Sequence, residues 1–189
     1  GNAAAQGLLA ATLARHGYTG AAQAFEGEWG FFRLYSPQPD PAAALAGLGE
    51  HWETLVDAIK PYPCCRAIHA PLDAAFALLE RGPIPVDAIE RVRVGMPRKR
   101  VDITGVPQER KREPRNVVDC QFSAHLCIAA ALVNGRLGFD DYEPAMADAR
   151  VRALMQRIDC HVDPRAEAEY PKTFPGRVEI DLKDGRRLE

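Results

Sequence analysis

Aromatic residues, long apolar runs and paired cysteines are all scarce in this sequence. Aromatic residues make up 7% of its 189 positions. No apolar run approaches the roughly 20 residues that a membrane-spanning helix needs, so we expect no membrane partner. The five cysteines are odd in number, and two of them, Cys64 and Cys65, are adjacent. This pattern indicates a reducing compartment, the cytoplasm, and not a disulfide framework.

Several common catalytic and nucleotide-binding motifs are also absent. The sequence contains no Walker A, GxGxxG, HExxH, GxSxG or paired CxxC motif, which excludes most nucleotide-binding, zinc-protease and hydrolase interpretations. The cysteines and histidines of residues 64–69 and 120–127 lack the spacing of zinc ligands. A free cysteine on an apolar helix behaves as a small apolar residue, so no metal site is predicted.

The charges are unevenly distributed along the chain. Lys and Arg number 2 against 6 Asp and Glu in residues 1–59, 12 against 7 in residues 60–115, and 10 against 13 in residues 116–189. A basic middle between acidic flanks predicts a segment that faces an anion such as a small carboxylate, and does not indicate a nucleic-acid partner.

The most basic stretch, residues 98–115, has seven basic and three acidic residues. Nucleic-acid readers usually add interleaved aromatics or a recognisable module, and neither is present here. A solvated loop is the favoured interpretation, a rim that steers an anionic substrate the second, and RNA or DNA binding a weaker third.

The sequence before residue 60 predicts an all-helical opening. Residues 3–15 are rich in Ala and Leu and end before Gly17, which is typical of a helix with a glycine stop. A short helix is expected at 20–27, and the apolar residues 29–35 suggest a buried loop. Prolines at 37, 39 and 41 then interrupt the chain.

The sequence after residue 60 alternates between helix and strand patterns. Apolar residues at helical spacing predict a helix that ends at about Arg81, before Gly82, and begins either just after Pro63 or at Pro71. Residues 97–118 are interpreted as a long loop. The other predicted elements are a strand at 89–96, a helix at 119–134 capped by Asp119 and ended by Gly135, a helix at 150–157, a strand at 158–162, and a hairpin that turns at Asp184-Gly185.

These patterns predict an α+β fold, in which strands and helices are interspersed, with at least one hairpin, after an all-helical opening. The boundary is expected either near the three prolines or just before Lys60. The last strand of the hairpin has only residues 186–189, which suggests a piece excised from something longer.

One stretch, KPYPCCRAIHAPLD at residues 60–73, concentrates chemically useful groups. Lys60, Arg66 and His69 lie near the start of a predicted helix, where unpaired N–H groups and the helix dipole favour an anion. Lys60 adds a compact charge, Arg66 a fork for carboxylate, and His69 a group that can move a proton near neutral pH. The alternative is a solvated loop with a core-facing histidine.

Four segments together resemble the MmgE/PrpD family, which includes 2-methylcitrate dehydratase, cis-aconitate decarboxylase and iminodisuccinate epimerase. They are KPYPCCRAIHAPLDAA, QFSAHLCIAAALVNG, EWGFF and the closing VEIDLKDGR, and they occur in consistent order through nearly the whole chain. The resemblance implies a large helical domain and a smaller α+β lid, commonly in a homodimer, that work without metal or organic cofactor. Residues 1–57 would be the tail of the helical domain and residues 58–189 the lid.

The resemblance also implies roles for single residues. Lys60 matches the family's active-site lysine, and His69 a histidine that often follows it. Gln121 and Ser123 fall in the QFS signature, with His125 nearby as a further substrate-binding candidate. Leu126 stands where many members have an aromatic residue. The implied partner is a small polycarboxylate.

We consider two functions from different classes. The first is a 2-methylcitrate dehydratase-like lyase that removes a proton and eliminates water, or a related decarboxylase or epimerase. In it Lys60 and His69 are catalytic, and Arg66 and Ser123 orient carboxylate. The second is a catalytically incomplete piece, or a non-enzymatic binding or structural module.

Overall fold

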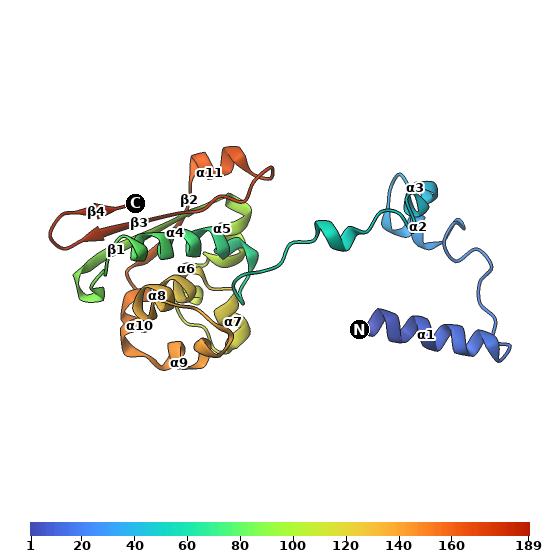
Figure 1. Ribbon diagram of the computed structural model, residues 1–189, viewed down its shortest axis with the longest axis horizontal. Helices are drawn as coiled ribbons and strands as arrows, with labels where there is room; N and C mark the ends of the chain where they lie inside the picture. The colour runs from blue at the N-terminus through green and yellow to red at the C-terminus, as the bar shows by residue number, and fades with distance from the viewer. The chain divides into compact units, whose positions relative to one another are not determined.

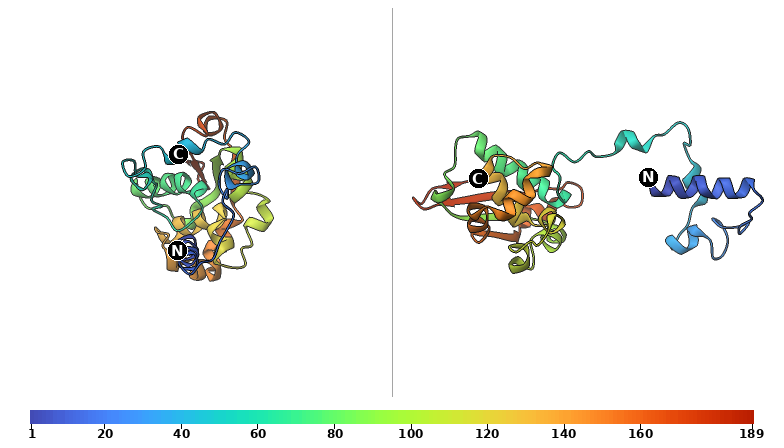
Figure 2. Two further views of the ribbon diagram at one scale, coloured as in Figure 1. Left: turned by 90° about the vertical axis from the view of Figure 1, so that its right-hand side faces the viewer. Right: turned by 90° about the horizontal axis from the view of Figure 1, so that it is seen from below.

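The computed structural model describes all 189 residues, which separate into two compact units, Gly1–Ala58 and Ile59–Glu189. Figures 1 and 2 show the helices and strands of each unit. None of the helices is both long and apolar enough to cross a membrane.

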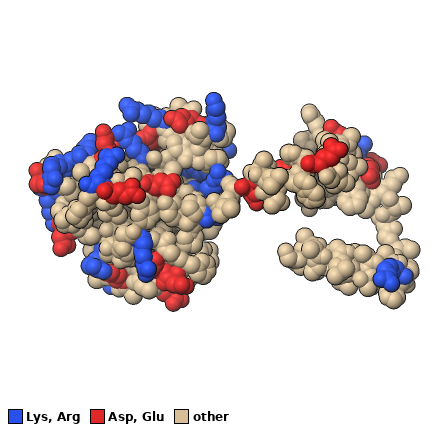
Figure 3. Space-filling view, viewed as in Figure 1, with Lys and Arg blue, Asp and Glu red and all other residues tan.

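The first unit contains one helix of 14 residues, three short ones and almost no buried side chain. Its elements are α1 (Asn2–Arg15), α2 (Phe31–Tyr35), α3 (Pro41–Leu45) and the 3-10 helix η1 (Glu53–Val56). No residue of α1 is buried, and Trp29 is 82% exposed. The surface of this unit in Figure 3 is accordingly mostly uncharged.

Two expectations for this unit were wrong. Residues 20–27 form turns and not a helix. Residues 29–35 are not a buried loop, because α2 begins at Phe31 and its aromatic rings are largely exposed. The stretch is apolar, as expected, but within the unit its rings pack only against one another and not against a larger core. The ring centres of Phe31 and Tyr35, for example, lie 4.7 Å apart.

The second unit is built on a mixed four-stranded sheet in the order β2-β1-β3-β4. Strand β1 (Ile89–Met96) lies parallel to β2 (Ile158–Val162) and antiparallel to β3 (Arg177–Leu182), which pairs with the short β4 (Arg187–Leu188). The predicted α+β class is confirmed, as are the strands at 89–96 and 158–162 and the hairpin turn at Gly185, where φ is +87°.

The two faces of the sheet differ because side chains alternate along each strand. Val92, Val94 and Met96 of β1 are fully buried. The helix α4 (His69–Glu80) contacts β1, and α8 (Ala124–Asn134) contacts both α4 and β2. Arg91 and Arg93 lie on the other face. There the Arg93 guanidinium pairs with Asp181 at 2.6 Å and Glu179 at 2.9 Å. One face thus forms the core and the other a charged, solvated ladder.

The helix that carries the predicted site begins within the range expected from its prolines. Residues Arg66–Ile68 form the 3-10 helix η2, and α4 follows directly from His69. Pro71 lies in the first turn of α4, where a missing N–H costs nothing. The helix ends at Glu80 before Gly82, as predicted.

Residues 97–118 are not a long loop. They contain α5 (Arg98–Thr104), α6 (Gln108–Lys111) and the start of α7 (Val117–Gln121). These helices are short and bury few side chains; in α5 only Val101 and Thr104 are buried. An apolar stripe of two residues is too brief to stand out against the basic residues around it.

The helix predicted at 119–134 is in fact two helices. The chain breaks at Phe122–Ser123, between α7 and α8, and the caps are Asn116 and Ser123 in place of Asp119. The predicted end is confirmed, because Gly135 adopts a left-handed φ of +68°. The remaining elements of the unit are η3 (Val86–Ala88), η4 (Phe139–Asp141), α9 (Tyr142–Ala147), α10 (Ala149–Met155) and α11 (Pro164–Glu169).

Candidate functional site

The segment before α4 brings two of the predicted residues to one atom. The ammonium nitrogen of Lys60 and Nε2 of His69 each lie 3.4 Å from the carbonyl oxygen of Cys64. The segment folds back on itself because Pro61 and Pro63 restrict the backbone, so that residue 60 returns beside the first turn of α4. A lysine and a histidine nine residues apart thus face the same point.

Tyr62, from the same segment, holds His69 in place. Its ring meets the imidazole edge to face with 5.5 Å between ring centres. Its hydroxyl donates a hydrogen bond of 2.6 Å to Asp73, one turn along α4. Burial and this hydrogen bond to Asp73 raise the pKa of Tyr62 to about 12, so the phenol stays a donor at neutral pH. We did not predict a role for Tyr62 or Asp73, although the KPYP string contains the tyrosine.

The surroundings of His69 favour its neutral form. Burial is the largest effect and lowers its pKa below the usual 6.5. The hydrogen bond to the Cys64 carbonyl opposes this in part, and the positive charges of Lys60 and Arg66 lower the pKa further. In the neutral imidazole Nε2–H donates to the Cys64 carbonyl, so Nδ1 is the nitrogen that can accept a proton at pH 7. The chemistry available at this point is therefore a fixed positive charge beside a base.

Arg66 extends the positive charge away from Lys60. Its guanidinium lies over the ring of Phe174, 4.6 Å from the ring centre. Phe174 belongs to the connection between α11 and β3, so Arg66 is fastened to a distant part of the chain. Arg100 of α5, in the segment interpreted as a loop, lies over the same ring at 4.4 Å.

The residues of the QFS signature are not brought to the Lys60–His69 pair. Gln121 contributes a backbone carbonyl, which accepts a 2.8 Å hydrogen bond from the Cys65 N–H and so ties α7 to the double-cysteine segment. Ser123 is fully buried. Its hydroxyl donates to the Lys111 carbonyl at 2.6 Å and accepts from the Leu126 N–H at 3.1 Å, so it caps α8.

His125 is also fully buried and engaged inside the protein. Its Nε2 lies 3.2 Å from Oε1 of Gln108 and its Nδ1 3.9 Å from the sulfur of Cys160. Burial, with Arg112 nearby, lowers the pKa of His125 to about 4. The imidazole is therefore a neutral, packed side chain.

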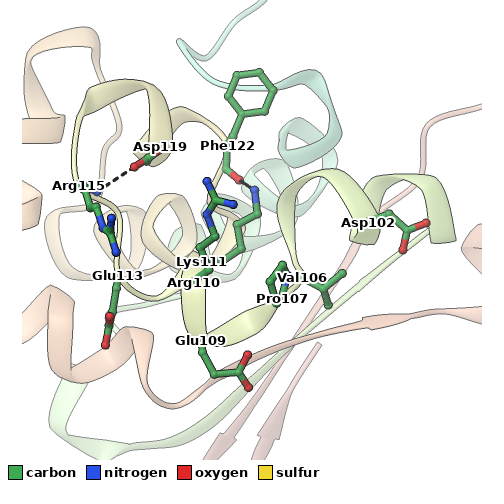
Figure 4. A pocket seen from close by; sticks show the side chains of 10 residues that line it. All are labelled: Asp102, Val106, Pro107, Glu109, Arg110, Lys111, Glu113, Arg115, Asp119 and Phe122. Atoms are coloured by element: carbon green, nitrogen blue, oxygen red, sulfur yellow. Dashed lines mark hydrogen bonds between the residues drawn. The ribbon is translucent and has the colours of Figure 1, made fainter.

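A hollow in the second unit lies away from this segment, around α6. It measures about 770 Å³ and is bordered by α6 and by Phe122. In Figure 4 the side chains of Arg110 and Lys111 extend toward the backbone of Phe122, while Glu109 extends the opposite way. The Lys111 ammonium donates to the carbonyl of Phe122 at 2.9 Å. Four acidic and three basic residues line this hollow, and Lys60, Arg66 and His69 are not among them.

The buried thiols offer no metal site. No group of three His, Cys, Asp or Glu side chains in the chain is placed to hold a metal ion. Burial raises the pKa of Cys120 to about 11 and that of Cys160 to about 12, so both stay protonated and serve as small apolar side chains.

Comparison with known proteins identifies the family of the chain. Residues 62–189 match the family model described as the MmgE/PrpD C-terminal domain, and residues 1–44 the MmgE/PrpD N-terminal domain. The cis-aconitate decarboxylase-like protein oryM of Aspergillus oryzae is 29% identical over 99% of this chain and 41% of its own length. The cis-aconitate decarboxylase of Aspergillus terreus is 26% identical over the whole chain and 41% of its length.

A second kind of relative matches a shorter part. The mitochondrial 2-methylcitrate dehydratase of Yarrowia lipolytica is 35% identical over 43% of this chain and 16% of its own length. The chain spans 41% of the length of the first two relatives. Since the C-terminal domain model alone covers more than half of its residues, the chain belongs to the MmgE/PrpD family.

Proposed function

We propose that the chain forms the cationic, carboxylate-binding part of a lyase that acts on a small di- or tricarboxylate. The observation that carries the proposal is the meeting of the Lys60 ammonium and the His69 imidazole at the Cys64 carbonyl. Both relatives named as decarboxylase or dehydratase act on polycarboxylates according to their names. Residues 1–57 would end a helical domain and residues 58–189 form its lid, in a cytoplasmic homodimer.

In this proposal Lys60 holds a carboxylate and stabilises negative charge that develops next to it. His69, neutral at pH 7, accepts the proton from the adjacent carbon. The bond from the β-carbon to its hydroxyl oxygen then breaks as the carbon–carbon double bond forms. The protonated His69 returns the proton to the departing hydroxyl, which leaves as water and completes a dehydration of the 2-methylcitrate type. Electrostatic stabilisation by a fixed cation, together with proton transfer to a positioned base, supplies much of the rate of such reactions.

Decarboxylation is the second candidate reaction, and one observation favours it. The decarboxylase relatives align over essentially the whole chain, whereas the dehydratase match covers 43% of it. In decarboxylation the carbon–carbon bond breaks, CO₂ leaves, and the carbon takes up a proton. The same cation and proton carrier serve both reactions, and epimerisation needs only the proton transfers.

We assign substrate contact to Lys60, His69 and Arg66. Ser123 and His125 make their polar contacts inside the protein, so we assign them the positioning of α8. Gln121 is half-buried beside Cys65 and would hold the double-cysteine segment against α7.

Lys60→Ala tests the proposal directly. Loss of a charged hydrogen-bonding partner costs about 1.5–3 kcal/mol, so cis-aconitate and 2-methylcitrate should bind the variant roughly 10- to 100-fold more weakly. Lys183→Ala, which removes an exposed lysine elsewhere in the unit, should bind like the unchanged chain. The measurement is an NMR titration of the full chain with each acid.

The same samples separate the two classes of function. We expect saturable binding, with turnover requiring the further length that the relatives have. Water loss from 2-methylcitrate or CO₂ release from cis-aconitate by this chain alone would show a complete enzyme. Binding that is unaffected by Lys60→Ala would contradict the proposed role of Lys60.

A further inference from the structure

Three separate segments of the second unit converge on Phe174. Arg66 comes from η2, Arg100 from α5, and the ring itself from the connection between α11 and β3. The guanidinium carbons lie 4.6 Å and 4.4 Å from the centre of the ring, and that of Arg100 also lies 5.3 Å from the centre of the Tyr170 ring. Two positive side chains thus share one aromatic surface.

Neither guanidinium has an acidic partner. The ion pairs of this unit engage other arginines, such as Arg91, Arg93 and Arg112, but not Arg66 or Arg100. The Nε of Arg100 is buried and has no hydrogen-bond acceptor. A buried unsatisfied donor costs about 1–3 kcal/mol, and an anion near the guanidinium offsets such a cost.

Stacking on a ring leaves a guanidinium ready to bind carboxylate. When a guanidinium stacks on the face of a ring, its N–H bonds lie in its own plane and remain available for a two-pronged carboxylate contact. Phe174 is 38% exposed and Arg66 is exposed as well. A ligand in solution can therefore reach Arg66 and the ring, while Arg100 is half-buried beside them.

The loop that carries Phe174 is fixed close to the Lys60–His69 pair. Gly176 packs against Pro71 so closely that an added Cβ would lie 2.3 Å from the proline Cδ. Pro71 is two residues after His69 in the first turn of α4. The rings of Tyr170 and Phe174 also meet edge to face at 5.8 Å. The loop that carries Phe174 therefore packs against the first turn of α4, the turn that also contains His69.

We propose that Arg66 and Arg100, aligned on Phe174, bind the second carboxylate of a polycarboxylate whose first carboxylate is held by Lys60 and His69. The inference rests on the proposed function and adds Arg100 as a specificity-determining residue. A site with these two groups of positive charge selects di- and tricarboxylates over monocarboxylates, because only a ligand with two or more carboxylates contacts both groups at once.

Arg100→Gln in the full chain tests this selectivity. The probes are cis-aconitate, with three carboxylates, and crotonate, with one, and binding is followed by NMR titration. We expect cis-aconitate to bind at least tenfold more weakly and crotonate to bind unchanged. Arg98→Gln, which removes an exposed arginine from the same helix, should alter neither.

Phe174→Leu keeps both positive charges and removes only their shared ring. We expect cis-aconitate binding to weaken several-fold, which tests the geometry even if Arg100→Gln folds poorly. Arg100→Lys should stay weakened, since a point charge lacks the planar fork.

Three results would overturn the inference. Wild-type affinity in both Arg100→Gln and Phe174→Leu would overturn it while leaving the role of Lys60 intact. Equal weakening of cis-aconitate and crotonate would show general charge attraction without a second carboxylate site. If the unchanged chain binds neither acid, the proposed function fails together with the inference.

Discussion

The two histidines of the second unit that were singled out as site candidates, His69 and His125, have different surroundings. His69 lies half-buried at the surface beside Lys60, within reach of a ligand. His125 is fully enclosed between Gln108 and Cys160. Both have a lowered pKa, but only for the first does this produce an accessible base. For the second it makes folding sensitive to pH.

His125 should make the free energy of unfolding fall in mild acid. Its pKa is about 4 in the folded protein and near 6.5 when unfolded, so the unfolded chain binds the proton first. Stability from this group is complete above pH 6.5 and decreases as the pH falls toward 4. The loss is on the order of 2 kcal/mol at pH 5.

Urea unfolding of His125→Leu at pH 7 and pH 5 measures this effect. The variant should lose most of the pH dependence between the two conditions, whereas His161→Leu, at an exposed histidine on β2, should keep it. An unchanged dependence in His125→Leu would assign the acid sensitivity to other groups.

At the scale of elements, the start of α8 depends on Ser123. The hydroxyl accepts a hydrogen bond from the Leu126 N–H and donates one to the Lys111 carbonyl, so one side chain caps a buried helix and fastens α6 to it. Asp119, the cap expected from the sequence, instead accepts hydrogen bonds from Arg115 and Asn116 on the surface.

Ser123→Ala should therefore destabilise the protein more than Asp119→Ala does. Loss of a helix cap costs about 1–2 kcal/mol, and the second hydrogen bond adds to this. Chemical denaturation at pH 7 gives both values. A larger decrease in the free energy of unfolding for Asp119→Ala would contradict the assignment of Ser123 as the more important cap.

The strands could be predicted, and the short helices could not. Val92, Val94 and Met96 alternate clearly with arginines, which made β1 recognisable. In α5, burial of Val101 and Thr104 depends on contacts with distant strands, and the neighbouring basic residues conceal the pattern. The break before Ser123 was missed for a similar reason, since apolar residues continue on both sides of it.

The candidate site, too, contains residues that the sequence could predict and residues that it could not. Lys60, Arg66 and His69 lie within ten residues, so the local sequence was enough to group them. Arg100 and Phe174 join them only through tertiary packing, which no spacing reveals. The polar residues of the QFS string looked equally suited to binding, and only their partners show that Ser123 and His125 serve packing.

On the scale of the whole molecule, the two units differ in how much they bury. Residues 59–189 contain the sheet and nearly all of the buried apolar side chains. Residues 1–58 instead expose large apolar side chains such as Leu55. Ile59, the first residue of the second unit, is 94% exposed. Burial of apolar surface is the main stabilising contribution in folding. The stability of the chain should therefore belong to the second unit.

A shortened chain of residues 59–189 checks this expectation. It should unfold cooperatively at the same temperature, within about 2 °C, as the full chain, and its amide spectrum should overlay on the corresponding residues. Calorimetry and NMR supply the two comparisons. A shortened chain that fails to fold would show that residues 1–58 stabilise the sheet.

The central position of β1 has a consequence for synthesis on the ribosome. Its Arg93 pairs with Asp181, 88 residues later in the chain, and β2 also comes long after it. At about 5–20 residues per second, this strand waits roughly 4 to 18 s in the nascent chain before both neighbours have been made. During that interval the valines of β1 have no neighbouring strand to pair with and stay exposed. We expect chaperones that bind apolar segments to bind this strand in the nascent chain.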